Sequence, residues 1–161
     1  MRTSNLNKTT HYPAHQTSNL NQLLEQAAEA LALKYKREGS FTNAENVKEY
    51  LKLKLGGYDR EVFALMLLDN QHQLIHFEEL FFGTIDAASV HPREVVKSAL
   101  NANAAAVILA HNHPSGIAEP SQADKQITSK LVDALALIDI RVLDHIVVGE
   151  SCISFAERGW I

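Results

Sequence analysis

Cysteine is almost absent from this sequence of 161 residues, which contains only Cys152. One thiol cannot form an internal disulfide, and it cannot supply the several thiolates of a Cys-rich zinc finger or of a Cys-ligated iron–sulfur cluster. A protein without disulfides suits a reducing compartment, so we expect this one to be cytoplasmic.

Long apolar runs and an excess of positive charge are also missing. No apolar stretch reaches the length of about 18 residues that a membrane-spanning helix requires, and the polar start of the chain lacks the apolar centre of a secretory signal peptide. The formal net charge is −4 and the isoelectric point is near 6.0, whereas proteins that bind nucleic acid carry basic surfaces. We therefore expect no membrane partner, and the charge argues against a nucleic-acid partner.

The sequence does contain alternating helix and strand patterns. Residues 1–18 are mostly polar and are predicted to form a flexible arm, and residues 19–41 have the apolar period of a helix. From residue 42 onward, helix signals alternate with short apolar runs, most clearly at 61–69 and 104–110. The pattern predicts one mixed α/β domain.

Two histidines, His111 and His113, follow the apolar run 104–110. Residues two apart on an extended segment point to the same side. Asp124 falls in the first turn of the next helix if Ser121 is the N-cap. Two imidazoles and one carboxylate suit Zn²⁺, and three protein ligands leave a fourth position for water, as in catalytic zinc sites. The sequence therefore predicts one zinc ion per chain, held by His111, His113 and Asp124.

Simpler interpretations compete with this one. A His-x-His pair is common, and Ser121 with Asp124 also forms a capping box that could serve only the helix. A cap leaves His111 and His113 unexplained, whereas a metal ion accounts for all the residues at once. Other hydrolase signals fit less well, because the chain has no His-Glu-x-x-His, too few cysteines for a zinc deaminase, and no Gly-x-Ser-x-Gly around Ser115.

Hydrolysis by a metal-activated water needs a base that accepts the proton of the water. The candidates are Glu61 at the start of an apolar run, Glu78 and Glu79 on a predicted strand, and Glu119 in the metal loop. The residue pattern alone leaves all four open.

Three other polar residues are interpreted as structural. Asp144 and His145 lie on the predicted strand 141–149, where we expect one of the two to face solvent. Cys152 has no evident base beside it and is expected to be a small buried residue rather than a nucleophile.

The arrangement of His111-x-His113, seven residues, Ser121, two residues and Asp124 is that of the JAMM (MPN-plus) metalloprotease motif. Longer segments resemble the RadC family in order and spacing. They are His91–Glu94, AVILAHNHPSG, PSQAD, DIRVLDHIVVG and SFAERGW. The resemblance covers about residues 42–161.

This resemblance implies a cytidine-deaminase-like JAMM fold, with a curved mixed sheet flanked by helices. It also implies zinc ligation by His111, His113 and Asp124, with Ser121 hydrogen-bonded to the catalytic water or the developing oxyanion. Glu61 matches the glutamate of the family motif, which favours Glu61 over Glu78 and Glu79. The segment before residue 42 is too short for the helix-hairpin-helix region of longer RadC proteins, so the chain resembles the short RadC-like proteins of prophages and other mobile elements.

The function that follows is zinc-dependent hydrolysis of an amide bond, by a metallopeptidase or isopeptidase acting on a peptide or protein. Two alternatives remain. One is a zinc-binding interaction module without catalysis, and the other is a DNA-repair-associated accessory protein, which would bind DNA in a salt-dependent manner.

Overall fold

The computed structural model describes residues 14–38, 41, 43–83 and 90–161, and these contain four helices and five strands. In chain order the elements are α1 (Ala14–Glu38), α2 (Ala44–Leu55), β1 (Val62–Leu68), β2 (Leu74–Phe82), α3 (Pro92–Asn101), β3 (Ala106–Asn112), α4 (Gln122–Ala136), β4 (Arg141–Val148) and β5 (Cys152–Ser154). The strands form one open sheet in the order β2-β1-β3-β4-β5. Only β3 and β4 pair in parallel, so the sheet is mixed. The predicted α/β class is confirmed.

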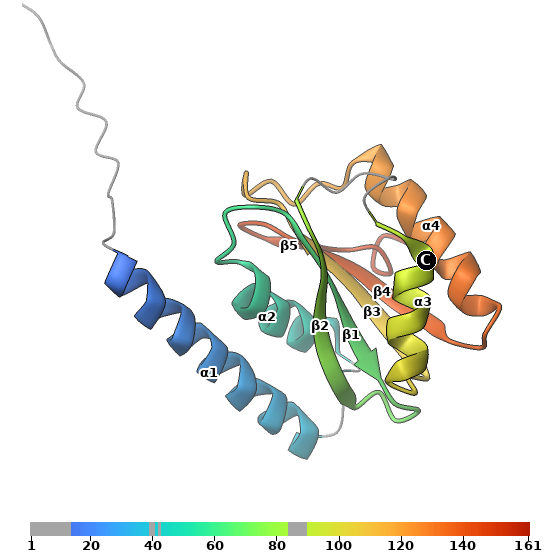
Figure 1. Cartoon of the computed structure of the whole chain (residues 1–161), viewed down its shortest axis with the longest axis horizontal. Coiled ribbons are helices and arrows are strands. Elements are labelled where there is room, and N and C mark those ends of the chain that lie inside the picture. Colours follow the sequence, from blue (N-terminus) through green and yellow to red (C-terminus); the bar gives the residue numbers. More distant parts are fainter. Residues whose placement is uncertain (1–13, 39–40, 42, 84–89) are drawn as a thin grey trace, which may run out of the picture.

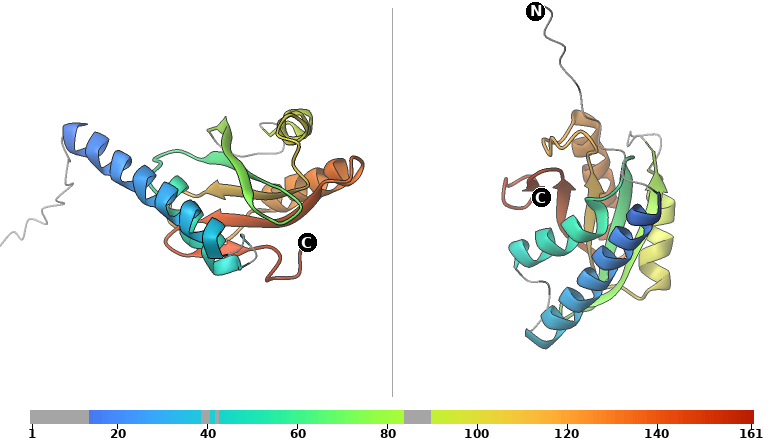
Figure 2. Two further views of the ribbon diagram at one scale, coloured as in Figure 1. Left: turned by 90° about the horizontal axis from the view of Figure 1, so that it is seen from below. Right: turned by 90° about the vertical axis from the view of Figure 1, so that its left-hand side faces the viewer.

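The sheet lies between two layers of helices (Figures 1 and 2). Alternate residues of β1 and β3 point to opposite faces, because side chains along a strand alternate. One set, which includes Met66 and Ile108, packs with α2 and α1, and the other, which includes Leu65 and Leu109, packs with α3 and α4. Every residue of β1 and of β3 is buried, which explains why both appear in the sequence as continuous apolar runs.

The first helix differs from its predicted bounds. The sequence predicted an arm over residues 1–18 and a helix over 19–41, whereas α1 runs from Ala14 to Glu38. Residues 14–18 contain neither glycine nor proline, so nothing in their backbone stops the helix from extending toward the N-terminus. The rest of the predicted arm, residues 1–13, lies outside the described residues. Among those that are described, no helix is both long and apolar enough to cross a membrane.

Asn112, the last residue of β3, ties this strand to the entry of β1. Its Oδ1 accepts a hydrogen bond from the Val62 N–H at 2.7 Å, and its Nδ2 donates to the Arg60 carbonyl oxygen at 3.0 Å. Glu61 lies between these two residues, and its own carbonyl accepts from the Gly83 N–H at 2.9 Å. The backbone on both sides of Glu61 is therefore fixed by one buried amide.

We expect Asn112→Ala to lower the free energy of unfolding by about 1–3 kcal/mol, because it leaves the buried Val62 N–H and Arg60 carbonyl without their partner. Urea denaturation followed by circular dichroism measures the change. Asn101→Ala is the matched control, since Asn101 is exposed at the end of α3 and its loss should change stability by less than about 0.5 kcal/mol. Equal stabilities of the two variants would contradict the assigned role of Asn112.

Candidate metal centre

Strand β3 brings both predicted histidines to one place. His111 lies inside β3, in register with Phe63 of β1 and Val147 of β4, and is fully buried. His113 follows the strand, and its N–H donates to the Val148 carbonyl at 2.8 Å. Because the neighbouring strands hold the backbone of both histidines, their side chains leave the end of β3 in fixed directions.

The start of α4 brings Asp124 to the same point. Ser121 is the N-cap, and its Oγ accepts from the Asp124 N–H at 3.1 Å and donates to Asp124 Oδ2 at 2.7 Å. Oδ2 also accepts from the Ser121 N–H at 2.7 Å, which completes the capping box. The cap involves Oδ2 only. Oδ1 faces His111 Nε2 at 3.3 Å. The Asp124 side chain can therefore cap the helix through Oδ2 and bind a metal ion through Oδ1.

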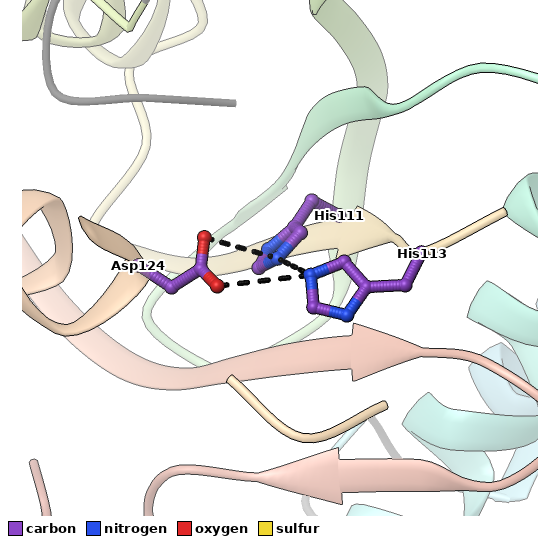
Figure 3. A group of neighbouring side chains, drawn as sticks. All are labelled: His111, His113 and Asp124. Atoms are coloured by element: carbon purple, nitrogen blue, oxygen red, sulfur yellow. Dashed lines mark hydrogen bonds and ion pairs between the residues drawn. The ribbon is translucent and has the colours of Figure 1, made fainter. Parts of the chain in front are cut away.

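The three side chains converge, as Figure 3 shows. His111 Nε2 and His113 Nε2 lie 3.0 Å apart, and His113 Nε2 lies 3.7 Å from Asp124 Oδ2. Two ligand atoms that are each about 2.0–2.1 Å from a tetrahedral zinc ion lie roughly 3.3–3.4 Å apart. The observed separations bracket this value, so the three residues could hold one metal ion after shifts of a few tenths of an ångström. The donor set of two imidazoles and one carboxylate suits zinc.

The orientation of His113 follows from its other nitrogen. Nδ1 lies 2.7 Å from the Ile117 carbonyl oxygen. A carbonyl oxygen can only accept, so Nδ1 carries the proton and donates it. In the neutral ring Nε2 is then unprotonated, and its lone pair is directed at His111 and Asp124. This is the form in which histidine binds a metal.

The charge of the cluster also favours a cation. Burial by itself would raise the pKa of the Asp124 carboxyl, but the adjacent His111 and His113 rings and the Ser121 hydroxyl hold this pKa well below its usual range. The hydrogen bond with Asp124 raises the pKa of His113, and the contact with the Ile117 carbonyl and the nearby Glu61 carboxylate raise it further, against an opposing effect of burial. A buried carboxylate thus stays ionised at neutral pH and must be balanced by a positive charge.

Glu61 comes directly before a strand that pairs with β3. Glu61 is half-buried and immediately precedes β1, whose neighbour β3 carries His111. The two hydrogen bonds from the Asn112 side chain to Arg60 and Val62 hold the backbone on either side of Glu61.

The other three glutamates are engaged elsewhere. Glu78 accepts a short hydrogen bond from Ser98 of α3, and Glu79 accepts from the Tyr58 hydroxyl at 2.8 Å. In the loop before α4, Glu119 forms an ion pair of 2.8 Å with Arg158. These three carboxylates are thus held by partners from other parts of the chain.

His145 of β4 is the residue that the sequence interpretation missed. The expectation that Asp144 or His145 faces solvent is wrong, because both are buried, with 7% and 0% exposure. Asp144 Oδ1 accepts from the His145 and Ala156 N–H groups, and Oδ2 accepts from Ser154 Oγ at 2.5 Å, so β4 tolerates this carboxylate. His145 Nε2 lies 2.8 Å from His111 Nδ1. Two adjacent polar residues among the apolar residues of 142–148 were the available signal.

A cleft of about 330 Å³ opens beside His113. Its walls come from the loop after β3, the end of β4 and the segment after α2, and they include Asn112, Ser115, Gly149, Glu150 and Tyr58. Gly149 allows this close packing, since a Cβ atom there would lie 2.3 Å from the Gly116 carbonyl oxygen. Of the three candidate ligands, His113 lines this cleft.

Comparisons with known proteins identify the family of this chain. A family model described as "RadC-like JAB domain" matches residues 41–160. A "UPF0758 protein" of Vibrio cholerae serotype O1 is 62% identical over 154 residues, which make up 96% of this chain and 98% of that protein. A "UPF0758 protein" of Aeromonas hydrophila is 58% identical over 143 residues, which make up 88% of this chain and 64% of that protein. The chain therefore belongs to the RadC family, and the candidate metal centre lies within its RadC-like JAB domain.

Proposed function

We propose that this protein is a zinc-dependent hydrolase that cleaves an amide bond in a peptide or protein. The observation that carries the proposal is the convergence of His111, His113 and Asp124 beside a cleft. A metal site with only three protein ligands keeps a position open for water, whereas structural zinc sites are closed by four. Membership of a JAB-domain family supports the same reaction class.

A zinc ion held there would lower the pKa of a water molecule and polarise the carbonyl group of the scissile bond. Glu61 accepts the proton of the attacking water and delivers it to the leaving nitrogen. Neutral His113, whose Nδ1 proton is donated to the Ile117 carbonyl, offers a bare Nε2 to the ion, and Asp124 offers an ionised carboxylate. The Ser121 hydroxyl donates its one proton to Asp124 Oδ2 at 2.7 Å in the structure. During the reaction it rotates and donates this proton instead to the oxyanion that forms on the substrate.

The cleft supports a peptide substrate. Its volume of about 330 Å³ is in the range of small ligand sites and suits a side chain with its flanking backbone. The loop after β3 lines one wall and carries His113, so a chain bound there passes directly beside the candidate metal centre. The acidic net charge of the protein gives the DNA-associated alternative no comparable support.

We expect the wild-type protein to bind about one zinc ion and His113→Ala to bind none, because the variant removes one of only three protein ligands. Elemental analysis of the purified proteins after exposure to zinc measures this. His76→Ala is the matched control, since His76 is exposed on β2 and its loss should leave the zinc content unchanged. Zinc retained by His113→Ala at the wild-type level would exclude the proposed ligand set.

We expect Glu61→Gln to keep zinc and to lower hydrolysis by about 10²–10⁴-fold, because glutamine retains the shape of glutamate but cannot accept a proton. Mass spectrometry of a diverse peptide mixture incubated with each protein identifies and quantifies cleavage. Glu78→Gln and Glu79→Gln are the controls and should cleave at the wild-type rate. Wild-type activity in Glu61→Gln would place the base elsewhere, and a zinc-loaded wild type that cleaves nothing would favour the non-catalytic alternative.

A further inference from the structure

A chain of hydrogen bonds continues from His111 away from the metal centre. His111 Nδ1 lies 2.8 Å from His145 Nε2, and His145 Nδ1 lies 2.6 Å from Thr128 Oγ1. Thr128 Oγ1 lies 2.6 Å from the backbone carbonyl oxygen of Asp124. The chain therefore starts at one candidate ligand, crosses from β3 through β4 to α4, and ends on the backbone of another.

The direction of each hydrogen bond follows from the Thr128 end. The Asp124 carbonyl oxygen has no proton, so the single hydroxyl proton of Thr128 must be donated to it. Thr128 Oγ1 then has only lone pairs left for His145, and His145 Nδ1 must be the donor of that bond.

The hydrogen bond between His145 and Thr128 also determines which atom donates in the bond between His145 and His111. The His145 ring is fully buried, and its neighbours include the rings of Phe63 at 5.8 Å and Phe155 at 4.8 Å between centroids. A positive charge enclosed among these rings would be cut off from water, which is strongly unfavourable, so the ring is neutral. A neutral imidazole with a proton on Nδ1 has a bare Nε2, which can only accept. His111 must therefore donate from Nδ1, and its own Nε2 carries the lone pair that faces His113 and Asp124.

We propose that Thr128 and His145 are positioning residues that hold His111 in the single tautomer able to bind a metal ion through Nε2. The inference rests on the proposed metal centre and deepens it. The sheet and α4 would then fix the positions of the ligands. They would also fix which nitrogen of His111 carries the proton before a metal ion binds. Outer hydrogen-bond partners of metal-bound histidines commonly change metal affinity by about 10–100-fold.

Two substitutions at Thr128 separate hydrogen bonding from packing. Thr128→Val keeps the branched shape and removes the hydroxyl, whereas Thr128→Ser keeps the hydroxyl and removes a methyl group. Without the hydroxyl, His145 has no acceptor at Nδ1. It can move its proton to Nε2 and donate to His111, which places the proton of His111 on the metal-binding nitrogen.

The first measurement is zinc affinity, by competition with a chromophoric chelator. We expect Thr128→Val to bind zinc about 10–100-fold more weakly than wild type, and Thr128→Ser to bind within a few-fold of it. A role in packing alone predicts the opposite order, because valine fills the site better than serine. Wild-type affinity in Thr128→Val would overturn the proposal.

The second measurement reads the tautomer directly in the metal-free protein, from the imidazole ¹⁵N chemical shifts of His111 at a pH well above the ordinary imidazole pKa of about 6.5. We expect protonated Nδ1 and bare Nε2 in wild type and in Thr128→Ser, and a shift toward protonated Nε2 in Thr128→Val. A wild-type His111 with its proton on Nε2 would overturn the proposal. This measurement does not depend on zinc. A wild type that binds no zinc would contradict the proposed function, whereas the wrong His111 tautomer would contradict the role of Thr128 and His145.

Discussion

The Asp124 carboxylate is 1% exposed and remains ionised, because His111, His113 and Ser121 all contact it. An isolated buried carboxylate would take up a proton or destabilise the fold by several kcal/mol. The groups around Asp124 keep it ionised and compensate for its burial. Strand β3 and the residue directly after it supply two imidazoles, the start of α4 supplies a hydroxyl and an N–H, and all of them meet at one carboxyl group.

The sheet makes this meeting possible. Strand β3 is central, with β1 on one side and β4 on the other, so His111 is surrounded by strands whose positions are fixed by their own pairing. The parallel pair β3 and β4 places His145 near His111, and α4, which connects these two strands, carries Asp124 and Thr128. A crossover from a strand to its parallel neighbour thus brings the metal-facing residues and their supporting residues together.

The sequence predicted much of this arrangement because its signals are local. Pro92 marks the start of α3, the run at 61–69 contains β1, and the spacing of His111, His113, Ser121 and Asp124 predicted their convergence. Periodicity and capping depend on neighbours in the chain, so they can be seen without a fold.

The remaining features depend on contacts between distant segments. His145 lies 34 positions from His111, and nothing local to β4 indicates that the two rings meet. The partners of Glu78, Glu79 and Glu119 likewise come from distant parts of the chain, and they are Ser98, Tyr58 and Arg158. The start of α1 was missed because polar residues are compatible with both a helix and an extended arm.

The most direct test of the account is anomalous X-ray diffraction at the zinc absorption edge, from crystals of the wild-type protein grown with zinc. We expect one anomalous peak within bonding distance, about 2.0–2.2 Å, of His111 Nε2, His113 Nε2 and an Asp124 carboxylate oxygen. A metal-free cluster in such crystals, or zinc bound only at other residues, would contradict the assignment of these three residues as a metal centre.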